Sequence, residues 1–203
     1  MTEEELVARA YVGDESAFTL LVEAYQVPVY NLCYRMLGES REAEDAAQES
    51  FLRAYSQLRR YDPQRSFKTW LFSVASHYCI DQLRKRRLTW LSLEDEEALP
   101  PHPALQDGTP GPDEMASRHE QEAAIQALLA RLSPEDRSVV IMRYWYDLSY
   151  EEIAEATRTT VSAVKSRLHR ARFALAEMLS PAGGRPGRQQ TGQPALAAGG
   201  VER

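Results

Sequence analysis

The chain has 203 residues, of which 43% are hydrophobic and 27% charged, a composition typical of a soluble globular protein. It has no apolar run of 18 residues, and its acidic start at residues 1–5 is unlike a secretory signal. We therefore expect a cytoplasmic protein without membrane insertion. Cys33 and Cys79 match neither a disulfide framework nor a metal-ligand cluster, so we expect two buried thiols.

The net charge of −6 argues against a nucleic-acid partner, but the charge is unevenly distributed. Residues 63–93 hold 6 basic residues and 1 acidic residue, and residues 158–203 hold 8 basic and 2 acidic ones. Residues 94–118 hold 1 basic and 7 acidic residues. Phosphate groups respond to the local field of a surface, so the two basic blocks are candidates for contact with nucleic acid.

Helical spacing of apolar residues recurs along the chain and strand-like alternation is nearly absent, which predicts an all-α protein. The first half should contain helices over residues 3–12, 15–37, 42–58 and 67–86. Thr2 and Glu5 form a capping-box pattern at the first of these. Pro28 lies inside the second and is expected to kink it.

Five prolines and seven acidic residues interrupt the helical pattern in the middle of the chain, which predicts an extended acidic linker over residues 89–117. Helices should resume over 119–132, 134–146, 150–156 and 161–179. The segment 181–203 is rich in Gly, Pro, Gln and Ala and is expected to be a disordered tail. The predicted fold is therefore two small helical domains, residues 1–88 and 118–180, joined by the linker.

The last two predicted helices are separated by a four-residue turn, residues 157–160, as in a helix-turn-helix. Val161, Val164 and Leu168 share the core-facing side of the second helix. The opposite side and its edges carry small and basic residues, namely Ser162, Ala163, Lys165, Ser166, Arg167, Arg170 and Arg172. We interpret this helix as a DNA reader, with residues 162–167 reading bases and Arg170 and Arg172 anchoring phosphates. The alternative is a merely solvated basic face.

The helix that begins at Phe67 combines aromatic residues with a basic end, residues 84–87. Such a surface suits single-stranded DNA, because bases stack on rings and phosphates meet cations. Aromatic residues can equally belong to the core, and for Trp70 and Phe72 we favour that interpretation. The helix over 42–58 shows no more than ordinary amphipathic periodicity.

Four segments in order, residues 44–55, 67–72, 148–154 and 164–172, closely resemble the extracytoplasmic-function sigma factors of bacterial RNA polymerase. The resemblance covers about residues 15–88 and 118–178. It implies two domains, called sigma regions 2 and 4. It also implies a non-enzymatic protein that binds core polymerase, recognises promoter elements and promotes DNA melting. No catalytic residue, cofactor or metal is implied.

The resemblance also assigns residues. Asp45, Gln48, Glu49 and Arg53 match the surface that binds the clamp helices of the polymerase beta-prime subunit, while region 4 would meet the beta flap. Residues 60–68 match a loop that captures a flipped base of the minus-ten element. The full set expected to contact that element is Arg60, Tyr61, Arg65, Phe67, Lys68, Ser73, His77, Arg84 and Arg87. The helix 161–172 matches the reader of the minus-thirty-five element.

Two further features follow from the resemblance. The acidic linker matches the segment that threads the polymerase active-site and RNA-exit channels, and an anti-sigma factor is an expected partner. Arg158 departs from the family pattern, because it stands in the turn where the family often has glycine. We therefore expect the turn to differ locally from that of the family.

Two other classes of function compete with this interpretation. A helix-turn-helix repressor or activator would use residues 118–178 for DNA binding and the first half for dimerisation, but it leaves the basic aromatic helix unexplained. An enzyme is the third alternative. The four histidines, His77, His102, His119 and His169, do not cluster with cysteines or carboxylates in a catalytic pattern.

Overall fold

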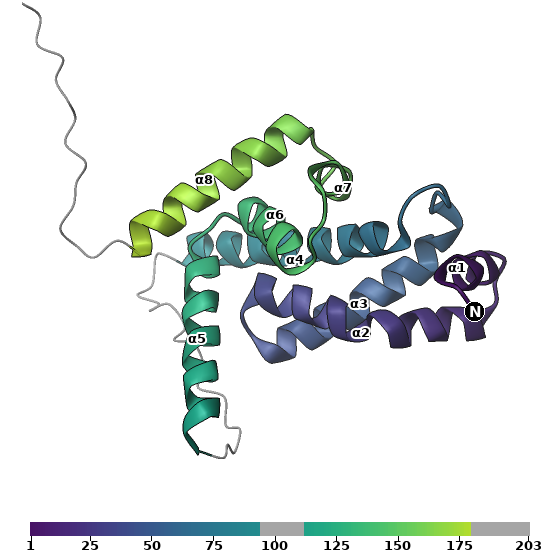
Figure 1. Cartoon of the computed structure of the whole chain (residues 1–203), viewed down its shortest axis with the longest axis horizontal. Helices are drawn as coiled ribbons and strands as arrows, with labels where there is room; N and C mark the ends of the chain where they lie inside the picture. The colour runs from purple at the N-terminus through teal and green to yellow at the C-terminus, as the bar shows by residue number, and fades with distance from the viewer. Residues whose placement is uncertain (94–111, 180–203) are drawn as a thin grey trace, which may run out of the picture.

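The computed structural model describes residues 1–93 and 112–179, and every regular element in these ranges is helical, as expected (Figure 1). The first half contains α1 (Glu3–Tyr11), α2 (Glu15–Leu37), α3 (Ser40–Gln57), the short 3-10 helix η1 (Leu58–Arg60) and α4 (Phe67–Leu93). The second half contains α5 (Pro112–Ala130), α6 (Pro134–Trp145), α7 (Tyr150–Ala156) and α8 (Val161–Leu179).

Helices α4 and α5 both extend into the segment predicted as the linker, residues 89–117. Helix α4 continues to Leu93, because residues 87–93 contain no proline or glycine, and α5 begins already at Pro112, a residue suited to the first helical position. The central part of the predicted linker and the predicted tail, residues 94–111 and 181–203, lie outside the described residues.

Local sequence signals set most of the other helix ends. Capping boxes formed by Thr2 with Glu5 and by Ser149 with Glu152 open α1 and α7. Ser133 caps α6 through the backbone N–H of Asp136. At the end of α2, Gly38 adopts a φ of 83°, a left-handed conformation that glycine tolerates without strain.

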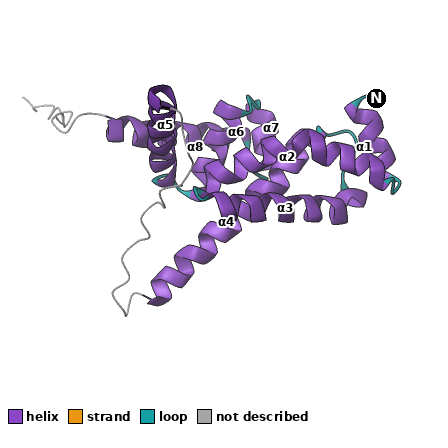
Figure 2. Ribbon diagram, turned by 90° about the horizontal axis from the view of Figure 1, so that it is seen from below, coloured by secondary structure: helices purple, strands orange, loops and turns teal. Residues whose placement is uncertain are grey.

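The core of the first half lies between α2, α3 and α4. Leu21, Leu32, Leu71 and Phe72 are almost completely buried there, at the positions that the helical periodicity places inside. Figure 2 shows α2 and α3 running side by side, with the last turns of α4 extending away from them. Burial of these apolar side chains supplies the main stabilisation of such a bundle.

Cys33 and Cys79 are buried free thiols on α2 and α4. Hydrogen bonding to Cys33, and then burial, raises the pKa of the Cys79 thiol. Burial was predicted from the apolar surroundings of both residues. Their proximity was not predicted, because the two cysteines are 46 positions apart in the sequence.

The second half is built on α6, α7 and α8, whose buried residues include Ile141, Met142, Ile153, Val164 and Leu168. Helix α8 lies across α6 and α7, and α5 projects from the body of the molecule (Figure 1). This part of the chain has the three-helix arrangement expected of a helix-turn-helix domain.

The two halves pack on each other through α6 and α7, which lie against α4, and through α6 against α2 (Figure 1). The hydroxyl oxygens of Ser76 and Ser138 are 2.6 Å apart and buried between α4 and α6. The Tyr146 hydroxyl donates to the carbonyl oxygen of Pro28 at 2.6 Å, and its ring lies 4.4 Å from the ring of Phe72. The buried core is therefore continuous across the two halves.

Arg137 is the most buried cation at this contact, with 6% of its surface exposed. It donates to the carbonyl oxygen of Met36 in the first half and to that of Ala130, at 2.8 Å, in the second. Burial lowers the pKa of Arg137 to about 10, so its guanidinium is still charged at neutral pH.

Candidate nucleic-acid interface

The turn between α7 and α8 has the geometry of a helix-turn-helix. The Thr157 hydroxyl donates to the carbonyl oxygen of Ile153 at 2.7 Å, and the Thr160 hydroxyl accepts from the backbone N–H of Ala163 at 3.1 Å, which caps α8. Arg158 has a φ of 50°. The chain therefore keeps the left-handed turn that a glycine would favour, with a side chain that strains it.

The polar face predicted for α8 lies on the surface. Ser162, Lys165, Ser166, Arg170 and Arg172 are exposed, and Ala163 and Arg167 are half-buried. The core-facing residues Val164, Leu168 and Ala171 are buried, as the spacing predicts. The small residues lie in the first turns of the helix, where a base edge can approach closely.

Three arginines of this face are hydrogen-bonded to residues of α6. Arg167 and Arg170 each donate to Oδ1 of Asp136 at 3.1 Å, and Arg172 donates to the Tyr144 hydroxyl at 2.7 Å. Asp136 and Tyr144 lie on α6. Neither residue was predicted from the sequence, because helical periodicity relates residues within one helix and not residues of neighbouring helices.

Several cations of the predicted minus-ten set contact the second half. Arg65 pairs with Glu155 of α7 at 3.2 Å, and Arg84 pairs with Glu135 of α6 at 2.6 Å. The Lys68 amino group donates to the backbone carbonyl oxygen of Tyr146 at 3.3 Å. In this arrangement, the cations that we expect to contact DNA are instead bonded to carboxylate and carbonyl oxygens of the second half.

Two aromatic residues of the predicted minus-ten set are buried. Tyr61 is 5% exposed and Phe67 is 3% exposed, with their ring centroids 5.8 Å apart, and both pack on Trp70. Burial of these two rings stabilises the folded state, so they hold the loop in place. Buried in this way, they are not exposed for stacking on a base. Arg60 and Arg65 remain exposed on that loop.

The other members of the minus-ten set lie along α4. Ser73 and His77 are half-buried, and Nδ1 of His77 lies 2.7 Å from the backbone oxygen of Ser73. Arg87 is exposed near the far end of the helix.

The predicted polymerase-binding residues lie on α3. Asp45 and Gln48 are exposed, and Glu49 accepts from Arg53 at 2.7 Å. The guanidinium of Arg53 lies 4.7 Å from the ring centroid of Tyr78 on α4, which fixes the pair in place. Leu52, which was not among the predicted residues, is 66% exposed on the same helix one turn after Gln48.

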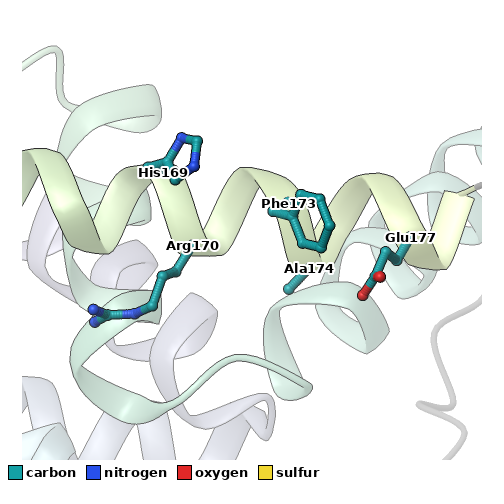
Figure 3. A pocket seen from close by; sticks show the side chains of 5 residues that line it. All are labelled: His169, Arg170, Phe173, Ala174 and Glu177. Carbon is teal, nitrogen blue, oxygen red and sulfur yellow. The ribbon is translucent and has the colours of Figure 1, made fainter. Parts of the chain in front are cut away.

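One pocket lies on the surface of α8, lined by His169, Arg170, Phe173, Ala174 and Glu177 (Figure 3). His169 and Glu177 are eight residues apart, about 12 Å along the helix axis, which is too far for a nucleophile-and-base pair. Within the described residues, no group of three His, Cys, Asp or Glu side chains could hold a metal ion. No helix among those residues is long and apolar enough to cross a bilayer.

Comparison with known families matches both halves of the chain. Residues 21–89 match sigma-70 region 2, and residues 122–175 match sigma-70 region 4. The ECF RNA polymerase sigma factor SigW of Bacillus subtilis is 36% identical over 170 residues, which are 82% of this chain and 91% of SigW. The sigma-H factor of Pseudomonas aeruginosa is 33% identical over 88% of this chain and 94% of its own length.

Solved structures show the same fold. The chain CnrH, in complex with the cytosolic domain of CnrY, superposes with a TM-score of 0.63 at 24% identity, covering 87% of this chain and 96% of CnrH. The sigma factor RpoE of Bartonella quintana, in complex with the anti-sigma factor NepR, superposes with a TM-score of 0.58 at 23% identity. It covers 80% of this chain and 96% of RpoE.

Proposed function

Because the chain belongs to the extracytoplasmic-function sigma factors, we propose that it binds core RNA polymerase through α3, and that α4 and α8 recognise the promoter. The protein would act in the cytoplasm and would catalyse no reaction itself. An anti-sigma factor is a further proposed partner, by analogy with the complex of RpoE and NepR.

The main support for the proposed DNA binding is the polar face of α8. Helix α8 follows a helix-turn-helix turn, buries its apolar side on α6 and α7, and exposes serines and arginines on the opposite side. Such a helix fits the major groove, where serines approach base edges and arginines contact guanine or phosphate. A basic face that is merely solvated would not need small residues at its start.

The proposed minus-ten surface is the basic side of α4 together with the loop before it. Exposed cations at Arg60, Arg65 and Arg87 can bind backbone phosphates of the unpaired strand. Base flipping costs a few kcal/mol, so the protein must provide compensating contacts. Ser73 and His77, half-buried between these cations, are the polar side chains that we assign to bases.

The function also requires the two halves to separate. Positions minus ten and minus thirty-five are about 25 base pairs apart, on the order of 85 Å along B-form DNA. Here Arg84 of the minus-ten surface and the arginines of α8 converge on adjacent residues, Glu135 and Asp136. We infer that the structure is a closed form, and that α6 and α7 leave α4 before both promoter elements are bound.

Initiation by purified core polymerase tests the proposal against the alternative of a repressor. Core polymerase plus this chain, without another sigma factor, should start transcription at discrete sites. A variant with Arg167, Arg170 and Arg172 replaced by alanine should lose dependence on the upstream element. An ordinary repressor or activator would give no specific initiation, and intact recognition in the triple variant would remove α8 as the reader.

A further inference from the structure

Asp136 lies outside the recognition helix and yet contacts two of its arginines. It belongs to the first turn of α6, where its backbone N–H donates to the capping hydroxyl of Ser133. Its side chain is 14% exposed, and Oδ1 accepts from Arg167 Nη1 and from Arg170 Nη2, both at 3.1 Å. The carboxylate is thus fixed at a helix start, while the two arginines come to it from α8.

From this contact, we propose that Asp136 is a positioning residue that sets the promoter specificity of α8 by orienting Arg167 and Arg170. The proposal rests on the assignment of α8 as the reader of the upstream element. It gives an acidic residue a role in DNA recognition, although it contacts no DNA itself.

The physical reason is the flexibility of arginine. A guanidinium reads a base only when its planar fork is aligned with the base edge, and an unrestrained arginine side chain samples many rotamers. The Arg167 side chain is 30% exposed and that of Arg170 is 59% exposed. The shared carboxylate therefore restrains the more enclosed Arg167 and the more exposed Arg170 differently. Arg167, the more enclosed of the two, is the one assigned to bases.

The charge of Asp136 has a separate effect, on the affinity for every sequence. A carboxylate beside two guanidinium groups lowers the local positive potential and so weakens sequence-independent attraction to phosphate. Orientation strengthens binding to the matched sequence, whereas charge compensation weakens binding to every sequence by about the same factor. Orientation alone therefore raises the ratio between matched and unmatched promoters.

A rival explanation makes the opposite prediction for the matched sequence. If Asp136 only competes with phosphates for the arginines, its neutralisation strengthens binding to every sequence equally and leaves the ratio unchanged. The sign of the change on the matched promoter therefore separates orientation from competition.

The experiment uses the full chain assembled with core polymerase, on two promoters that differ only in a matched or scrambled upstream element. The test variants are Asp136→Asn and Arg167→Ala. The control is Glu151→Gln, which removes an exposed carboxylate from the first turn of α7. For Asp136→Asn we expect the matched-to-scrambled affinity ratio to fall about ten-fold, within the range of one bidentate base contact. The control should keep the wild-type ratio.

Three outcomes are distinguishable. A lower ratio in Asp136→Asn, with weaker matched and stronger scrambled binding, supports the proposal. An unchanged ratio in Asp136→Asn, together with a collapsed ratio in Arg167→Ala, overturns the role of Asp136 and leaves α8 as the reader. Unchanged ratios in both variants overturn the assignment of α8 itself. Thermal unfolding of each variant checks that a changed ratio does not arise from a disordered domain.

Discussion

A disulfide between α4 and α6 should trap the closed form and block initiation. The hydroxyl oxygens of Ser76 and Ser138 are 2.6 Å apart and both side chains are buried, so cysteines at these two positions are placed to bond. The cross-link would close a loop across 62 positions of the chain, for which the chain-entropy relation gives about 4 kcal/mol. The oxidised double variant should therefore unfold roughly 10 °C higher than the reduced one.

Transcription from core polymerase measures the functional consequence. The oxidised double variant should give no promoter-specific transcript, and a reductant should restore it, because α4 is released from α6. Each single cysteine variant, treated with the same oxidant, is the matched control and should retain activity. Wild-type initiation by a protein whose cross-link is verified by peptide mapping would refute the closed-form reasoning. A fall in unfolding temperature on oxidation would also count against it, since the bond would then strain the observed contact.

Three further predictions concern single surfaces. Replacing Asp45, Gln48 and Glu49 with alanine should weaken binding to core polymerase strongly and leave helicity intact, because these side chains lie on the outer face of α3; unchanged affinity in a pull-down titration would contradict the assignment. His77→Ala should reduce open-complex formation more than closed-complex binding, and a permanganate footprint equal to wild type would argue against a role in melting. Arg158→Gly should be about 1 kcal/mol more stable than Arg158→Ala in chemical denaturation, because both lose the cation and only glycine relieves the left-handed φ of 50°; equal stabilities would mean that the turn is not strained.

Local physics made much of the fold predictable. The capping boxes at Thr2 and Ser149, the serine and proline that open α6, and the buried spacing of Val164 and Leu168 are all encoded within a few residues of each other. The exposed face of α8 follows from the same periodicity. The ends of the domains were harder to predict, because no proline or glycine stops α4 after its predicted end, and the helix continues to Leu93.

The missed features all depend on residues far apart in the chain. Asp136 precedes Arg167 by 31 positions, and Ser76 precedes Ser138 by 62, so no periodicity links them. The family resemblance placed Tyr61 and Phe67 at a DNA-binding loop without showing that their rings face the core. Position in a motif and exposure of a side chain are separate properties, and only the packed structure gives the second.

The most direct test of the central claim is the mapping of transcript starts made by core polymerase with and without this chain on genomic DNA. We predict starts that depend on the added chain and share two upstream elements, with the minus-thirty-five element losing its influence when Arg167, Arg170 and Arg172 are replaced by alanine. Starts that are independent of the added chain, or that share no upstream sequence, would contradict the account.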